Sequence, residues 1–228
     1  MGNNLLQKID DLPKGPFLIE EGESLRLELA FFERGADGEL DIHVKEGSSL
    51  SLYLADFAPE SNKLTLSIHL EENASCEVRL AVLSGDNATK VYVPNVIHHA
   101  PFSTALVSCY GIATEASELN FSGLSTIEKG AKKSSTRQEA KVILFDRSSK
   151  GAASPALKIS ENDVKAGHGA SIGRLNDMHL FYLKSRGLTE NEAKRLIILG
   201  YLKPIVRYFS DESVQQRIDV AIEKGVGK

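Results

Sequence analysis

The residue best suited to chemistry in this sequence is His168, which stands between Gly167 and Gly169. Because glycine has no side chain, a ligand or a partner protein could approach the imidazole ring closely. Neutral imidazole is a borderline ligand that suits iron and other transition metals. We therefore treat His168 as a candidate metal ligand. The alternative is a structural histidine that hydrogen-bonds within the fold.

The other soft side chains do not form a recognisable metal site. His98 and His99 are adjacent, so on a strand they point to opposite faces, and we expect one of them to be buried. Cys76 and Cys109 are the only cysteines, form no CxxC motif, and continue the apolar alternation of their segments. A free cysteine in such a place behaves as a small hydrophobic residue. We expect both thiols in the core and no tightly bound cofactor.

No motif for nucleotide hydrolysis or for hydrolytic catalysis stands out. Gly225-Val226-Gly227-Lys228 is similar to the end of a phosphate-binding loop, but it follows a predicted helix and lacks the Ser or Thr that holds Mg²⁺. No Ser-His-Asp set and no pair of carboxylates can be picked out. We expect a protein that is not an enzyme and does not hydrolyse ATP by itself.

Composition and charge narrow the class of protein. The 228 residues are 42% hydrophobic and 25% charged, which is typical of a globular protein with one sizeable domain, alone or with a small appendage. A formal net charge of -4 argues against nucleic acid as the main partner. The longest apolar run, 196–202, is far shorter than the roughly 20 residues that cross a bilayer. Residues 1–4 show no signal-peptide pattern, so we expect a cytoplasmic protein that does not bind membranes.

The elements that position these residues begin with a set of predicted strands. Apolar residues occupy every second position within 25–29, 40–44, 50–54, 64–70 and 76–82. Such alternation predicts strands with one buried face. No helical pattern separates these five segments, so the first part of the chain is mainly β.

The breaks between these segments resemble one another. Gly22, Gly47, Asn73 and Gly130 each supply a residue that tolerates positive φ, and the first three follow one another at about 25 residues. A repeat of that length predicts a solenoid of stacked rungs. An immunoglobulin-like sandwich would also give many short strands and stays an alternative at this point.

After about residue 174 the apolar spacing becomes helical. Thr189 and Glu192 form a predicted capping box, Gly187 ends the helix before it, and Pro204 ends the helix after it. The apolar stripes are Met178, Phe181 and Tyr182, then Ala193, Leu196, Ile197 and Gly200, then Val214, Ile218, Ala221 and Ile222. We therefore divide the chain into a β domain, 1–174, and a helical domain, 175–228. The helical part is too short to fold alone, so it must pack on the β part or on a partner.

Residues 97–206 resemble the SufB/SufD family of the SUF iron-sulfur cluster assembly system. The family patterns P-x-L-E-I, D-V, H-G-A-[ST]-x-G and F-Y-L-x-S-R-G correspond here to Pro155–Ile159, Asp163-Val164, His168–Gly173 and Phe181–Gly187. The resemblance implies a right-handed parallel β-helix followed by a small C-terminal helical domain. That agrees with the alternating strands and capped helices.

Departures from the family patterns indicate a SufD-like chain. Glu139 stands where SufB-type members have a cysteine, and Gly169 stands where they have Glu after the histidine. Lys158 replaces the acidic residue of P-x-L-E-I, which puts any role of that carboxylate in doubt. Longer members carry an N-terminal helical domain, whereas strands are expected to begin here by about Ser24.

The resemblance implies a non-ATPase scaffold subunit of the SUF machinery. Such a subunit pairs through its β face with a SufB/SufD-type chain, as a homodimer or a heterodimer, and an iron-sulfur cluster could form transiently at that interface near His168. Its helices would dock the SufC ATPase through Phe181, Tyr182, Arg186, Leu196, Ile197 and Tyr201. One alternative is a minimal SufB-like scaffold that acts with SufC alone. Another is a carbohydrate-active enzyme on a β-helix, against which the absence of Trp counts.

Overall fold

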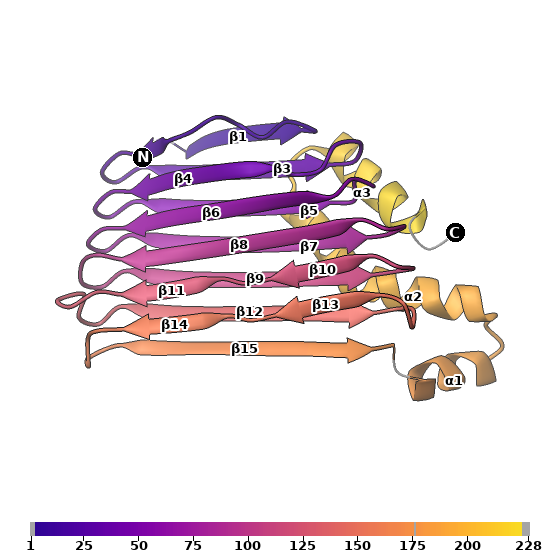
Figure 1. Ribbon diagram of the computed structural model, residues 1–228. Coiled ribbons are helices and arrows are strands. Elements are labelled where there is room, and N and C mark those ends of the chain that lie inside the picture. The colour runs from indigo at the N-terminus through magenta and orange to yellow at the C-terminus, as the bar shows by residue number, and fades with distance from the viewer. Residues whose placement is uncertain (1–2, 176, 225–228) are drawn as a thin grey trace.

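The computed structural model describes residues 3–175 and 177–224, and its β part is a flattened solenoid of two parallel sheets (Figure 1). The first sheet contains, in spatial order, β1 (Asn3–Ile9), β3 (Ser24–Phe31), β5 (Ser49–Asp56), β7 (Ser75–Ser84), β9 (Thr104–Ala113), β12 (Ser135–Leu144) and β15 (Lys165–Arg174). The second contains β2 (Phe17–Ile19), β4 (Gly38–Val44), β6 (Asn62–Leu70), β8 (Thr89–His98), β10 (Glu118–Phe121), β11 (Leu124–Ile127), β13 (Lys150–Ala153) and β14 (Ala156–Ile159). The predicted parallel β-helix is thereby confirmed.

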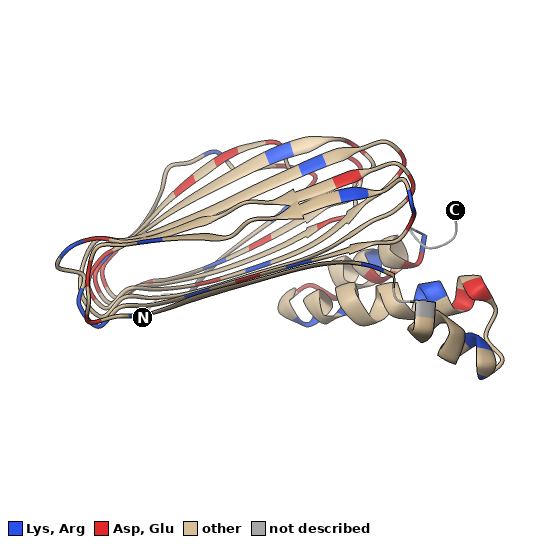
Figure 2. Ribbon diagram, turned by 60° about the horizontal axis from the view of Figure 1, so that its bottom comes forward, with Lys and Arg blue, Asp and Glu red and all other residues tan. Residues whose placement is uncertain are grey.

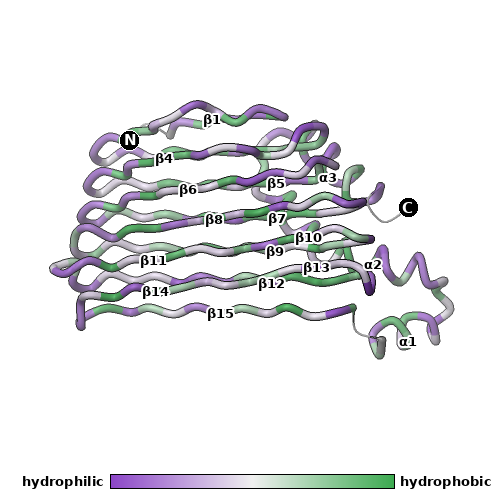
Figure 3. The backbone as a smooth tube through the Cα atoms, viewed as in Figure 1, coloured by the Kyte–Doolittle hydropathy of each residue, from purple (hydrophilic) through white to green (hydrophobic). Residues whose placement is uncertain are grey.

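All five segments predicted from alternation are strands, namely β3 to β7. Figure 3 shows the alternation of hydropathy along them. The expectation that strands begin by about Ser24 is confirmed, and β1 and β2 add two strands before that residue. Both strands belong to the terminal rung, where burial is incomplete. Leu5 is 53% exposed and stands beside the partly buried Leu6, so apolar residues do not occupy every second position there.

The turns confirm the role given to the repeated breaks. Gly22, Gly47, Asn73 and Gly130 all have positive φ, between 54° and 96°. Further turns reach positive φ with residues that give no such signal, namely Asp86, Phe102, Glu115 and Lys133. Positive φ therefore recurs in the turns, although only some positions reveal it in the sequence.

In-register pairing stacks like side chains into columns inside the solenoid. One column runs through Leu27, Leu52, Val78 and Val107, all buried. Cys76 and Cys109 belong to neighbouring columns and are buried as predicted, and burial raises the pKa of each thiol to about 12. Both cysteines therefore act as core residues and not as thiolate ligands.

The helical tail lies on the outer face of the first sheet. It consists of α1 (Asp177–Ser185), α2 (Glu190–Leu202), the 3-10 helix η1 (Lys203–Tyr208) and α3 (Glu212–Lys224). Figure 1 shows α1 near β15 and α3 near β3, and Figure 2 shows the helices against one layer only. The tail thus runs back along the sheet toward the N-terminal rungs.

Helix boundaries follow the predicted signals, but one buried stripe differs. Thr189 and Glu192 form the predicted capping box, and Gly187 has a φ of 96°. The residues that α2 buries are Ala193, Ile198 and Leu202, whereas the sequence favoured Ala193, Leu196, Ile197 and Gly200. The α3 stripe of Val214, Ile218 and Ile222 is confirmed. All of these buried residues except Ala193 share one core with Tyr53, Leu83 and Ile112 of the first sheet.

A buried carboxylate fastens the tail to the sheet. Glu28 on β3 is fully buried and accepts hydrogen bonds from Ser210, through the backbone N–H at 2.9 Å and the hydroxyl at 3.0 Å. It also pairs with Arg26 at 2.5 Å, and Arg26 donates to the carbonyl of Tyr208 at 2.6 Å. Strand β3 therefore holds the chain between η1 and α3.

Glu28→Ala is expected to lower the free energy of unfolding by about 2 kcal/mol, because it leaves buried donors without an acceptor. Chemical denaturation would measure the loss, and hydrogen exchange should rise in residues 205–222. Glu71→Ala is the matched control, since Glu71 pairs with Lys45 at 2.7 Å and both side chains are partly exposed. A surface pair of that kind contributes below about 1 kcal/mol. Equal losses in the two variants would contradict the clamp.

Candidate functional site

The last rung leaves one end of the solenoid open. Among the described strands, β15 pairs only with β12, β13 only with β10, and β14 only with β11. At the opposite end Leu6, Leu12 and Phe17 pack against the core and close it. The backbone groups on the free side of β15 and β14 are available for a further strand.

His168 lies at the β15 end of an interior column of side chains. It pairs in register with the buried Gln138 on β12, which in turn pairs with Val107. Because side chains in register share a face, the His168 ring lies on the inner side of the sheet. It is exposed because no described rung covers it. A Cβ atom at Gly167 or Gly169 would meet nothing within 4 Å; both positions alternate with His168 and face the outer side of the sheet.

Apolar side chains occupy other inward positions of the rung that carries His168. Ile159 on β14 is 45% exposed and Ile172 on β15 is 46% exposed, although both occupy inward positions of their strands. We call the inward residues of the last rung the open-end surface: Leu157, Ile159, Ala166, His168, Ala170 and Ile172. The open-end surface has the apolar character of the solenoid interior, and His168 is the one imidazole among its six residues.

A buried polar layer lies directly beneath the open-end surface. The Gln138 amide is 2.5 Å from the Ser125 hydroxyl, and Thr136 donates to the same hydroxyl at 3.1 Å. All three side chains are buried. Sequence reasoning missed this layer. The available signal was that inward positions change from apolar to polar at β11 and β12.

His98 and His99 lie on opposite faces, as their adjacency predicted. His98 is fully buried, and its Nδ1 is 2.7 Å from the Ser103 hydroxyl, which contacts Ser134 at 3.0 Å. Burial, and second the neighbouring His99, lowers the pKa of His98 to about 4. The His98 ring is therefore neutral at physiological pH and closed off from solvent.

Glu139, at the position of the SufB-type cysteine, lies on the outer face of β12. It pairs with Lys141 at 2.9 Å and accepts from the Tyr110 hydroxyl at 3.1 Å. The hydrogen bond from Lys141 lowers the pKa of Glu139. This carboxylate is therefore engaged on the side of the sheet opposite to His168.

The tail carries a second apolar surface, on α1 and α2. Phe181 is 72% exposed and Tyr182 is 55% exposed, and the Arg186 guanidinium lies 5.0 Å from the centre of the Tyr182 ring. Leu196 and Tyr201 on α2 are also exposed. We call these five residues the tail surface. Ile197, the sixth predicted docking residue, is half-buried.

The segment Gly225-Val226-Gly227-Lys228 lies outside the described residues. Among the described helices, none combines the length and the apolar character needed to cross a membrane.

Fold and surfaces together define a parallel β-solenoid with an open last rung and a helical tail that presents apolar side chains. Residues 38–201 match the family described as SUF system FeS cluster assembly, SufBD core domain. The chain belongs to this family. The resemblance inferred from the sequence motifs is thus confirmed.

Individual SufD and SufBD family proteins agree with this assignment. The iron-sulfur cluster assembly protein SufD of Bacillus subtilis is 34% identical over 150 residues, which cover 66% of this chain and 34% of that protein. A SufBD family protein of Mycobacterium tuberculosis is 29% identical over 159 residues, 68% of this chain and 19% of that protein. SufD of Escherichia coli is 29% identical over 107 residues, 47% of this chain and 25% of that protein. The chain spans about a third or less of each of these relatives.

Proposed function

We propose that this chain is a SufD-like, non-ATPase scaffold subunit of the SUF machinery that works in the cytoplasm. One observation carries the proposal: a single molecule exposes two separate apolar surfaces, the open-end surface and the tail surface. Large exposed apolar patches on proteins mark interaction sites. Two such surfaces suit a subunit that joins two different partners.

The open-end surface would bind a second SufB/SufD-type chain, either another copy or a partner subunit. Free strand edges favour the addition of a strand from another chain. Pairing would bury Ile159 and Ile172, which already occupy core positions of the rung. His168 would then lie inside the interface, where its imidazole could help hold an iron-sulfur cluster as transient cargo.

The tail surface would dock the SufC-type ATPase. Aromatic and arginine side chains dominate the binding energy of many interfaces. Phe181 and Tyr182 lie on α1, and Arg186 directly follows it and contacts the Tyr182 ring. The buried stripe of α2 and the Glu28 clamp hold the tail on the first sheet. Movement of a docked ATPase would therefore be transmitted to the β-solenoid.

Docking can be tested by calorimetric titration of SufC into the purified chain. Phe181→Ala and Arg186→Ala are each expected to weaken binding about thirtyfold, or about 2 kcal/mol, because both remove a central anchor. Val220→Ala is the matched control, since Val220 is an exposed apolar residue on α3, outside the tail surface. Circular dichroism would verify folding. Wild-type affinity in folded Phe181 and Arg186 variants would place docking elsewhere.

The SufD-like role can be separated from that of a minimal SufB-like scaffold. A SufD-like subunit is expected to retain no stoichiometric acid-labile sulfide after anaerobic reconstitution with SufC alone. Stable cluster content under those conditions would support the SufB-like alternative.

A further inference from the structure

A column of histidines stands on the outer face of the second sheet. His43 on β4, His69 on β6 and His99 just after β8 stack with parallel rings, with centroids 4.5 Å and 5.2 Å apart. Asp41 and Glu128 flank the column. We call these five residues the histidine column. The carboxyl ends of β4, β6 and β8 lie at the left of Figure 1, and the helical tail lies at the right.

Register brings these residues together. His43 pairs directly with His69, and Asp41, two residues before His43, lies on the same face of β4. The pairing continues past the strand ends, because the His99 N–H donates to Leu70 and the Glu128 N–H donates to His98. The column therefore has the same rigid support as the solenoid itself.

Three atoms that could ligate a metal ion converge at one end of the column. Asp41 Oδ1 lies 3.4 Å from His43 Nε2 and 3.4 Å from His69 Nε2, and ligand atoms of the three residues lie within 4.8 Å of one another. A distance of 3.4 Å is long for a hydrogen bond. It is close to the separation of about 3.4 Å between neighbouring donors in a tetrahedral site with bonds of about 2.0–2.1 Å.

The other end of the column fixes which nitrogen is free. Glu128 Oε2 lies 2.9 Å from His99 Nδ1, and an ionised carboxylate can only accept, so this nitrogen carries the proton. His99 Nε2 then accepts from His69 Nδ1 at 2.9 Å. When His69 and His99 are both neutral, His69 Nε2 is left with a lone pair that faces the Asp41 carboxylate. A cation between Asp41 and His69 resolves this opposition.

We propose that Asp41, His43 and His69 bind a divalent first-row transition metal ion such as Zn²⁺ or Fe²⁺, with His99 and Glu128 as positioning residues. Two imidazoles and one carboxylate suit these borderline ions better than Mg²⁺ or Ca²⁺, which prefer oxygen ligands. A metal-bound histidine commonly donates its second ring nitrogen to an outer partner, as His69 does here. Side-chain exposures of 42% for His43 and 27% for His69 leave the ion accessible from solvent.

The site differs in place and in chemistry from the surfaces of the proposed function. It lies on the second sheet, whereas the tail packs on the first. Metal binding by the isolated chain therefore succeeds or fails independently of docking to SufC or pairing at the open end.

Titration of Co²⁺ into tag-free protein at pH 7.5, followed by visible absorption and then by displacement with Zn²⁺, tests the proposal. One ion per chain is expected, with the intensity of a four- or five-coordinate site and no displacement by millimolar Mg²⁺. His69→Ala and Asp41→Asn should each weaken binding at least tenfold, and the His43→Ala, His69→Ala double variant should abolish it. Glu128→Gln should weaken binding about tenfold through His99.

His179→Ala is the matched control, because His179 is an exposed histidine on α1 outside the column. It should bind Co²⁺ as the wild type does. Circular dichroism would establish that each variant is folded. Absence of saturable Co²⁺ and Zn²⁺ binding in the wild type, or unchanged binding in the folded double variant, would overturn the proposal.

Discussion

Asp56→Ala is expected to lower the free energy of unfolding by about 3–5 kcal/mol, because it strands a buried lysine without its counter-charge. Asp56 ends β5 and Lys90 lies on β8, and both side chains are fully buried with Asp56 Oδ1 2.7 Å from Lys90 Nζ. Urea denaturation monitored by circular dichroism would measure the loss.

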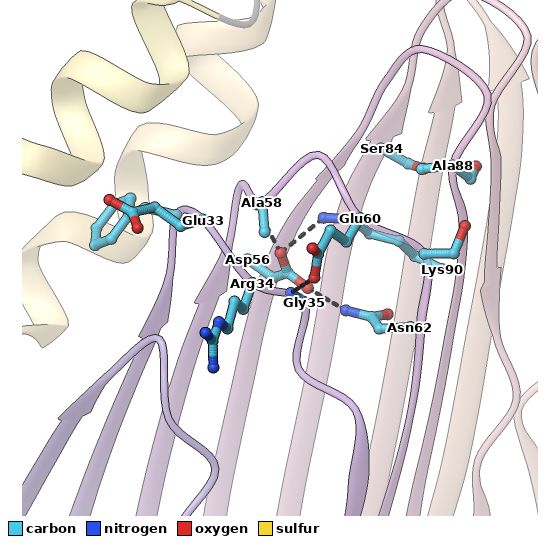
Figure 4. Close-up of polar contacts among 12 residues, drawn as sticks. Glu33, Arg34, Gly35, Asp56, Ala58, Glu60, Asn62, Ser84, Ala88 and Lys90 are labelled. Carbon is cyan, nitrogen blue, oxygen red and sulfur yellow. Dashed lines mark hydrogen bonds and ion pairs between the residues drawn. The ribbon is translucent and has the colours of Figure 1, made fainter.

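The Asp56 carboxylate collects donors from several rungs. Figure 4 shows it between Ala58, Asn62 and Lys90. It accepts from the Ala58 N–H at 3.0 Å and from Asn62 Nδ2 at 2.5 Å, and the Tyr92 hydroxyl also donates to it. This network joins the two sheets at the turn that follows β5, so removing its centre disturbs both.

Burial lowers the pKa of Lys90, and Asp56 opposes that effect. Replacing both residues by apolar ones, as in the Asp56→Leu, Lys90→Met double variant, should therefore cost less than Asp56→Ala alone. A single-variant loss below about 1 kcal/mol would show that the pair contributes little.

Ile172→Asp is expected to weaken pairing at the open end at least a hundredfold, because the carboxylate would have to be buried in an apolar interface. Sedimentation of the chain alone, and of the chain mixed with a SufB partner, would measure the association. The substitution should leave the fold intact, since Ile172 is 46% exposed in the single chain.

Leu5→Asp is the matched control for the open end. Leu5 is an aliphatic residue of similar exposure on β1, the edge strand at the opposite end of the same sheet. It should leave pairing unchanged. If Leu5→Asp dissociated the pair and Ile172→Asp did not, the interface would lie at the N-terminal rung.

Local patterns predicted the elements, whereas non-local packing decided which helix residues are buried. Alternation identified β3 to β7, and the capping box at Thr189 was correct because both depend on neighbouring residues. The α2 stripe was wrong at Leu196 and Gly200, which are exposed, because Ile198 and Leu202 are the residues that pack with the first sheet. The orientation of a helix on a sheet depends on both surfaces.

The candidate sites divide in the same way. His168 was recognisable from its glycine flanks and its motif, but its position over Gln138 and Ser125 depends on rung stacking. His69 and His99 gave no joint signal, because 30 residues separate them in the sequence. Only the length of a rung brings such residues within contact distance.

The sequence by itself determined the family, the parallel β-solenoid with its helical end, and the buried state of both cysteines. These features depend on short-range periodicity, turn residues and fixed motifs, which can be read along the chain. Only the tertiary structure decided that the last rung is open, that Glu28 clamps the tail, and that the histidine column exists. The histidine column depends on the register between rungs, which brings together residues separated by whole turns of the solenoid. The clamp depends on how the tail packs on the first sheet, and the open end depends on the unpaired edges of the last strands.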